Sequence, residues 1–142
     1  MEATALKARD ATADDVATIA QISVDAWRAA YRGHMPDALL DGLKVEERAR
    51  MWAGVLARPA PSRLIVTEPV TGFCFYGPSR DGELDVAEIF AIYVRPDCWR
   101  QGAGRVLCEH VELDAAAREC KALTLWVLKT NEPARHFYER IG

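Results

Sequence analysis

One stretch of the chain, residues 89–111, joins an apolar run to a glycine-containing loop and then to a helical pattern. The run Ile89–Val94 is rich in β-branched residues, which favours a strand, and the loop Trp99–Gly104 follows after a short turn. The first N–H groups of a helix have no partner within the helix, and the helix dipole adds positive potential there. A strand that leads through glycines into a helix therefore predicts an anion site, and we expect the anion to be a phosphate.

The residues of this loop suit a phosphate ligand. Gly102 and Gly104 have no Cβ atom to keep the backbone away from a diphosphate, and Arg100 and Arg105 add positive charge beside them. The loop has neither the Gly-Lys-Ser/Thr ending of a Walker P-loop nor the spacing of a dinucleotide-binding GxGxxG. Taken alone, however, a Gly-x-Gly sequence marks an ordinary helix start more often than a ligand site.

The sequence PDCWRQGAGRVL, which begins at Pro96, resembles the acetyl-CoA-binding motif of the GCN5-related N-acetyltransferases, the GNAT family. That motif is usually written Gln/Arg-x-x-Gly-x-Gly/Ala, and this chain has Trp99 at its first position. The resemblance implies that acetyl-CoA is the co-substrate. The coenzyme site predicted on the strand and the loop consists of Ile92, Tyr93, Val94, Arg100, Gln101, Gly102, Ala103, Gly104 and Arg105.

A second segment, LWVLKTNEPARHFYERIG at residues 125–142, carries the same resemblance. In the family, an asparagine at this point contacts the pantetheine arm, and a tyrosine seven residues later lies at the thioester sulfur. These residues are Asn131 and Tyr138 here. From the residues alone, Asn131 also suits a helix cap, and Tyr138 beside Phe137 also suits a core position.

Acetyl transfer needs an acceptor amine that has lost its proton. An alkylammonium with a pKa of about 10.4 and a glutamate of about 4.3 differ by about six units, which opposes direct proton transfer by about 8 kcal/mol. The base must be desolvated, act through water, or meet an amine that is already neutral. Glu88 matches the position of the strand glutamate that is the base in histone-acetylating members of the family. By alternation we expect Glu88 to share a face with Phe90 and Ile92, and a solvated carboxylate at a strand edge is the alternative.

The remaining steps concern the sulfur, the carbonyl oxygen and the acceptor. A phenol is slightly less acidic than a thiol, so Tyr138 is expected to hydrogen-bond the sulfur as it gains charge. Backbone N–H groups of residues 92–94 can meet the carbonyl oxygen if a bulge separates this strand from residues 122–128. Trp27 and Tyr31, at the end of the first helical pattern, are candidates for an acceptor pocket, although core packing explains them more simply.

The order of predicted elements gives an α/β fold with a mixed central sheet, in the order β-αα-βββ-α-β-α, as in the family. The residues assigned to each element are 5–9 (strand), 12–31 (capping box and helix), 36–56 (helices broken near Gly42), 63–67 and 72–76 (hairpin), 84–94 (strand), 103–119 (helix), 122–128 (strand covered on both faces) and 131 onward (helix). We expect residues 1–142 to be a single acetyltransferase domain. The family usually continues with one or two more strands, so we expect them to be truncated here or replaced by a neighbour in a homo-oligomer.

Composition excludes several classes of protein. The 142 residues suit one domain, and the net charge of -3 without a dense basic run argues against nucleic acid as a partner. No apolar run approaches 18 residues, so no membrane partner is expected. The four cysteines have no metal-binding spacing, so we expect no metal site and a cytoplasmic protein with reduced thiols.

The sequence therefore predicts an acetyl-CoA-dependent N-acetyltransferase that passes its acetyl group directly to a primary amine of an unidentified acceptor. The expected partners are acetyl-CoA and that amine. A non-catalytic acyl-CoA-binding or sensor domain on the same scaffold is the main alternative. A domain that binds another phosphate ligand is the third.

Overall fold

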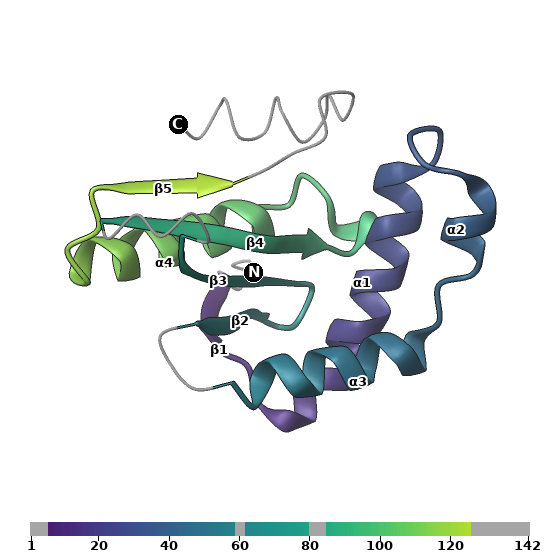
Figure 1. Ribbon diagram of the computed structural model, residues 1–142, viewed down its shortest axis with the longest axis horizontal. Helices are drawn as coiled ribbons and strands as arrows, with labels where there is room; N and C mark the ends of the chain where they lie inside the picture. Colours follow the sequence, from purple (N-terminus) through teal and green to yellow (C-terminus); the bar gives the residue numbers. More distant parts are fainter. Residues whose placement is uncertain (1–5, 59–61, 80–84, 126–142) are drawn as a thin grey trace, which may run out of the picture.

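The computed structural model describes residues 6–58, 62–79 and 85–125, whose strands form one five-stranded sheet in the order β1-β2-β3-β4-β5 (Figure 1). The first four strands are antiparallel to their neighbours, whereas β5 is parallel to β4. This mixed sheet confirms the predicted class of fold. The strands are β1 (Lys7–Asp10), β2 (Arg63–Glu68), β3 (Gly72–Pro78), β4 (Val86–Val94) and β5 (Ala122–Leu125).

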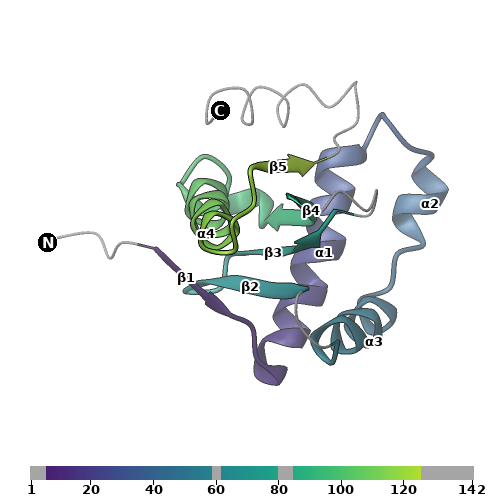
Figure 2. The ribbon, with the colours of Figure 1, turned by 60° about the vertical axis from the view of Figure 1, so that its left-hand side comes forward.

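Helices cover both faces of the sheet. Figure 2 shows α4 on one side and α1 and α3 on the other. The helices are α1 (Val16–Tyr31), α2 (Asp37–Asp41), α3 (Val45–Leu56) and α4 (Ala103–Ala117), and short 3-10 turns occupy Ala13–Asp15 and Pro96–Cys98. The order of these elements confirms the prediction as far as β5. The helix expected from Asn131 onward lies outside the described residues.

Alternation along the central strand β3 divides the core into two layers. Phe73 and Phe75 face α1 and α3, where they pack with Ile19, Ile22 and Trp52. Cys74 and Tyr76 face the other way and belong to the layer that contains Leu107 and Val111 of α4. Each large apolar side chain that is fully buried stabilises the fold by about 1.5–3 kcal/mol, so β3 is the strand on which both layers depend.

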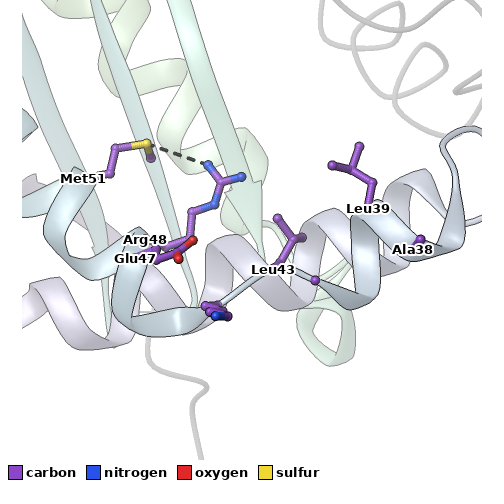
Figure 3. Close-up of a pocket in the computed structure, with 8 residues that line it drawn as sticks. Ala38, Leu39, Leu43, Glu47, Arg48 and Met51 are labelled. Atoms are coloured by element: carbon purple, nitrogen blue, oxygen red, sulfur yellow. Dashed lines mark hydrogen bonds between the residues drawn. The ribbon is translucent and has the colours of Figure 1, made fainter.

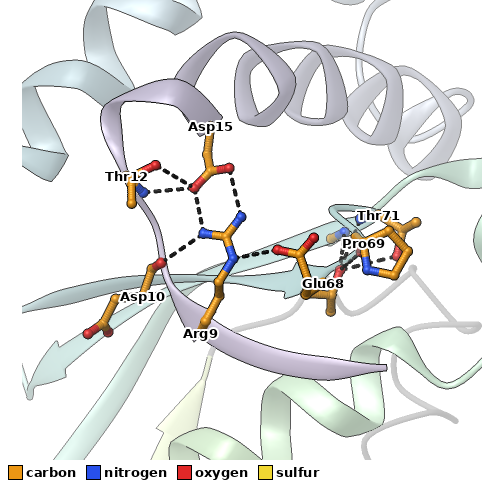
Figure 4. Close-up of polar contacts among 9 residues, drawn as sticks. Arg9, Asp10, Thr12, Asp15, Glu68, Pro69 and Thr71 are labelled. Carbon is orange, nitrogen blue, oxygen red and sulfur yellow. Dashed lines mark hydrogen bonds and ion pairs between the residues drawn. The ribbon is translucent and has the colours of Figure 1, made fainter. Parts of the chain in front are cut away.

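The start of α1 is tied to the sheet by a charge network (Figure 4). The Asp15 carboxylate accepts hydrogen bonds from the Thr12 backbone N–H at 2.8 Å and from both terminal nitrogens of Arg9 at 2.8 and 3.0 Å. The Nε atom of Arg9 also donates to Glu68 of β2 at 2.6 Å. The hydrogen bond from Arg9, together with the Thr12 N–H, lowers the pKa of the buried Asp15 carboxyl although burial opposes its ionisation. The capping box predicted at Thr12 is therefore confirmed.

Two details differ from the sequence predictions. The strand expected at residues 72–76 is longer, because Gly77 and Pro78 still belong to β3. In β5, exposed and half-buried residues alternate over Ala122–Leu125, so this part of the strand is not covered on both faces. In the part of the chain that the structure describes, no helix is long and apolar enough to cross a membrane.

Candidate functional site

A β-bulge in the middle of β4 determines which side chains share a face. Phe75 of β3 pairs with Ala91, but Tyr76 pairs with Ile89, so Phe90 is one extra residue in β4. An extra residue shifts all later side chains to the opposite face. Phe90 and Ala91 accordingly both pack against the layer of α1 and α3, whereas Ile92 packs against the layer of α4. The prediction that Ile92 shares a face with Glu88 and Phe90 is therefore wrong for Ile92.

Glu88 lies inside the sheet on the face that carries α1 and α3. Its neighbour Ile89 points into the opposite layer, and the Glu88 side chain is only 1% exposed. The residue is flanked by Gly77 of β3 and Thr124 of β5, so it does not lie at a strand edge. The solvated carboxylate that was the alternative is thereby excluded. The structure instead places Glu88 in buried surroundings, which is one of the conditions given above for a carboxylate base, and its role as the base stays a prediction.

Gly77 leaves little room beside Glu88. A Cβ atom at Gly77 would lie 2.8 Å from Ser62 Oγ and 3.2 Å from the Phe90 ring. The Phe90 ring is in turn 5.1 Å from the Phe75 ring, measured between centroids. The neighbourhood of the Glu88 carboxylate is therefore packed closely on its β3 side.

Beyond the bulge, β4 is paired with β3 and with no other strand among the described residues. Within the described residues, β5 pairs with β4 only as far as Ile89. Arg95 donates its N–H to the Thr71 carbonyl at 2.8 Å and Tyr93 pairs with Phe73, so these two residues direct their backbone groups toward β3. Backbone groups alternate along a strand, so those of Ile92 and Val94 point to the opposite edge. Two of the three predicted strand residues can thus offer an N–H group to a ligand there, and Tyr93 cannot.

The glycine loop joins this edge to the start of α4. Gly102 is the N-cap residue with a φ of 93°, and the first helical hydrogen bond runs from the Val106 N–H to the Gly102 carbonyl at 3.0 Å. The N–H groups of the first turn, at residues 103–105, precede that bond and have no carbonyl within the helix to bond. A Cβ atom at Gly102 would meet nothing within 4 Å, so its conformation and not crowding calls for glycine.

The charged and amide side chains of the loop differ in whether they have a polar partner among the described residues. Arg100, which adopts a positive φ of 65°, and Arg105 are both exposed, and neither is in an ion pair with any residue that the structure describes. Gln101 is partly engaged, because its side-chain amide donates to the Asp97 carbonyl at 3.3 Å. The two arginines are therefore available to an anion at the start of α4.

Trp99 is a residue whose contact the sequence did not reveal. Its indole N–H donates to the Val94 carbonyl at 2.8 Å, so the loop is fastened to the end of β4. The tryptophan stands at the position where the family motif has glutamine or arginine. That departure from the motif was the signal in the sequence that this residue could have a particular role.

The predicted acceptor residues Trp27 and Tyr31 lie together and next to β4. Their rings meet edge to face with centroids 4.9 Å apart, and Trp27 lies 6.5 Å from the Tyr93 ring of β4. Burial, with a smaller effect of Tyr31, raises the pKa of the Tyr93 hydroxyl well above its ordinary value, so this hydroxyl is neutral at physiological pH. The aromatic cluster is on the same face of the sheet as Glu88.

A cavity of about 450 Å³ lies beside this cluster, between α2 and α3 (Figure 3). The Arg48 guanidinium connects the cavity to the aromatic cluster. It lies 5.3 Å from the centre of the Trp27 ring and 3.7 Å from the sulfur of Met51 in the cavity wall. Arg28 of α1 holds the wall in place by donating to the Leu40 and Leu43 carbonyls at 3.0 and 3.1 Å. The lining residues are Ala38, Leu39, Gly42, Leu43, Lys44, Glu47, Arg48 and Met51.

Two predicted site residues cannot be placed. Asn131 and Tyr138 lie outside the described residues, so their roles at the pantetheine arm and the sulfur stay predictions from the sequence.

These features define an α/β domain in which a strand edge and a glycine loop meet at a helix start. Residues 16–142 match the family model of the acetyltransferase (GNAT) family. The chain belongs to this family and is a GNAT-type N-acetyltransferase.

Comparison with individual proteins agrees with this assignment. The chain is 29% identical over 132 residues to the uncharacterized N-acetyltransferase YuaI of Bacillus subtilis (strain 168), covering 92% of this chain and 76% of YuaI. It is 42% identical over 59 residues to the [ribosomal protein bS18]-alanine N-acetyltransferase of Escherichia coli (strain K12). That second match spans 42% of this chain and 40% of the other.

The fold also matches a solved acetyltransferase. The crystal structure of PaiA N-acetyltransferase from Thermoplasma acidophilum, in complex with coenzyme A, superimposes with a TM-score of 0.83. The sequences are 16% identical, and the match covers 98% of this chain and 89% of the other. Members of the family use acetyl-CoA.

Proposed function

We propose that this chain binds acetyl-CoA and transfers its acetyl group directly to a primary amine, with residues 1–142 acting as one acetyltransferase domain. The observation that carries the proposal is the geometry of β4. Within the described residues its edge opposite β3 has no partner strand after Ile89, and the same strand leads into a helix start whose first N–H groups have no partner in the helix. Arg100 and Arg105 beside it form no ion pair with the part of the chain that the structure describes. A ligand with both an amide-containing arm and a diphosphate suits this combination.

The diphosphate would lie at the start of α4. The N–H groups of residues 103–105 supply hydrogen-bond donors, and Arg100 and Arg105 supply charge. The free backbone groups of Ile92 and Val94 would bond the arm as a neighbouring strand does, and Asn131 would contact the same arm. The thioester carbonyl would then lie beside a strand N–H that is fixed before the reaction begins.

Glu88 is the proposed base. The amine nitrogen attacks the thioester carbon, the carbon–sulfur bond breaks, and the proton leaves the nitrogen toward Glu88, either directly or through a water molecule. Tyr138 would donate a hydrogen bond to the departing sulfur. Because the bond forms directly between nitrogen and the acetyl carbon, the enzyme itself is not acetylated.

The acceptor would approach from the face that carries α1 and α3, because Glu88 and the aromatic cluster both face that side. Trp27 and Tyr31 would line its path with Tyr93. The cavity between α2 and α3 would hold the part of the acceptor that lies away from the amine, and its wall offers apolar surface from Leu39 and Met51 beside the cation of Arg48.

A thermal-shift assay followed by an amine panel tests the proposal. Coenzyme A should raise the melting temperature of the protein more than ATP at the same concentration, and equal effects would favour a general phosphate site. The panel, which should include a peptide with an N-terminal alanine, should then give acetyl transfer to at least one amine. Protection by coenzyme A without transfer to any amine would favour a sensor domain.

A further inference from the structure

The indole of Trp99 bridges two parts of the candidate coenzyme site. Its N–H donates to the Val94 carbonyl at 2.8 Å. That carbonyl points to the open edge of β4, because the next residue, Arg95, directs its N–H toward β3. Trp99 therefore bonds the last carbonyl on this edge, while the Ile92 groups and the Val94 N–H point the same way with no strand paired to them among the described residues.

Among the described hydrogen bonds and ion pairs of residues 96–101, the indole bond is the one that reaches β4. The Arg95–Asp97 ion pair, at 2.7 Å, and the bond from Gln101 to the Asp97 carbonyl lie within the turn itself. Two residues with positive φ, Arg100 and Gly102, follow immediately after the tryptophan. Such residues change the chain direction sharply, so a fixed point before them determines where the first turn of α4 faces.

Burial does not explain the tryptophan. Its side chain is 42% exposed, although large aromatic residues contribute to stability mainly when they are buried. Trp52 offers the opposite case. It is 4% exposed and packs on Phe73 with ring centroids 4.9 Å apart, and its indole nitrogen has no hydrogen-bond partner among the described residues. Trp52 is thus held by the packing of its ring, whereas Trp99 makes a hydrogen bond through its N–H and leaves much of its ring exposed.

We propose that Trp99 is a positioning residue for the coenzyme. Its indole bond to Val94 fixes the angle between the β4 edge and the start of α4, so that a single ligand can bond to both. The inference rests on the proposed function, because it assumes that coenzyme A lies across these two elements. On this inference, the N–H donor of Trp99, and not its ring, strengthens the binding of coenzyme A.

Two substitutions separate the donor from the ring. Trp99→Phe keeps an aromatic ring without a donor, and Trp99→Gln keeps an N–H donor without the ring. Titration calorimetry with coenzyme A should show that Trp99→Phe raises the dissociation constant about fivefold, as the loss of one hydrogen bond predicts. Trp99→Gln should bind more tightly than Trp99→Phe. Both variants should keep the melting temperature close to that of the unmodified protein, because 42% of the Trp99 residue is exposed and its ring is not part of the buried core.

Trp52→Phe is the matched control, since it removes an indole N–H that makes no hydrogen bond to the described part of the chain. It should lower the melting temperature and leave the affinity for coenzyme A unchanged. Equal affinity of Trp99→Phe and the unmodified protein would overturn the inference, and so would a Trp99→Gln variant that binds no better than Trp99→Phe. Failure of the unmodified protein to bind coenzyme A would instead refute the proposed function, so the two failures are distinguishable.

Discussion

Glu88 and Gly77 face each other across the β3–β4 ladder, so the single carboxylate of β4 lies beside a residue that has no side chain. Space on that side is already filled, because Ser62 and Phe90 both approach the position of a Cβ atom at Gly77 to within 3.2 Å or less. There is therefore no space for a side chain at Gly77 on the face that carries Glu88.

Glu88→Gln removes the proposed base with little change in volume. Loss of a general base reduces turnover by about 10²–10⁴-fold, whereas the affinity for coenzyme A should not change. Steady-state kinetics with the best amine of the panel, together with calorimetry, measures both. Glu46→Gln, at an exposed position of α3, is the control and should behave like the unmodified protein. Full turnover in Glu88→Gln would show that the proton leaves by another route.

Gly77→Ala introduces a methyl group where the structure has no room. The Ser62 hydroxyl at 2.8 Å and the Phe90 ring at 3.2 Å must both move, so we expect the free energy of unfolding to fall by about 1–3 kcal/mol. Urea denaturation measures this change. Gly54→Ala in α3 is the control, because its Cβ atom meets nothing within 4 Å, and it should stabilise the helix by about 0.5–1 kcal/mol. Equal stabilities of the two variants would contradict the packing described here.

Gly102→Ala tests the loop. The added Cβ meets no protein atom, but the φ of 93° is unfavourable for alanine by about 1–2 kcal/mol. The methyl group would also stand where the diphosphate is proposed to approach the backbone. We expect a modest fall in stability and a much larger fall in affinity for coenzyme A, measured by calorimetry on the folded variant. Gly54→Ala again provides the control, and unchanged affinity in Gly102→Ala would place the diphosphate elsewhere.

Asp15→Asn tests the charge network at the start of α1. The pKa of Asp15 is lowered in the folded protein, mainly by its hydrogen bonds with Arg9, so its carboxylate stabilises the fold above its unfolded pKa of about 4. This contribution is lost as the pH falls through the lower, folded pKa. The substitution should therefore destabilise the protein by about 2 kcal/mol at pH 7 and by progressively less below about pH 4. Denaturation curves across this pH range, with exposed Asp14→Asn as the control, measure the difference.

The sequence predicted most elements because local patterns determined them. The β-rich runs at residues 63–67 and 72–76, separated by a short turn, specified the hairpin, Thr12 and Asp15 marked the start of α1, and Gly42 marked the break between α2 and α3. The bulge at Phe90 could not be predicted, because the apolar run Ile89–Val94 has no polar residue to show which side faces the core. That hidden shift is why the face of Ile92 was assigned wrongly.

The candidate site was predicted unevenly. Glu88 is buried, and Trp27 and Tyr31 lie together beside β4, but their roles as base and acceptor pocket stay predictions. The bond between Trp99 and Val94 depends on how a turn folds back on its strand, which no periodicity encodes. The sequence could therefore supply candidate residues, and only the structure could show how they are arranged.

The most direct test of the account is a crystal structure of this protein with bound coenzyme A. We predict density for the diphosphate at the N–H groups of residues 103–105, and density for the pantetheine arm along Ile92 and Val94 on the open edge of β4. Coenzyme density at another surface, or a coenzyme whose arm leaves this edge unoccupied, would contradict the account.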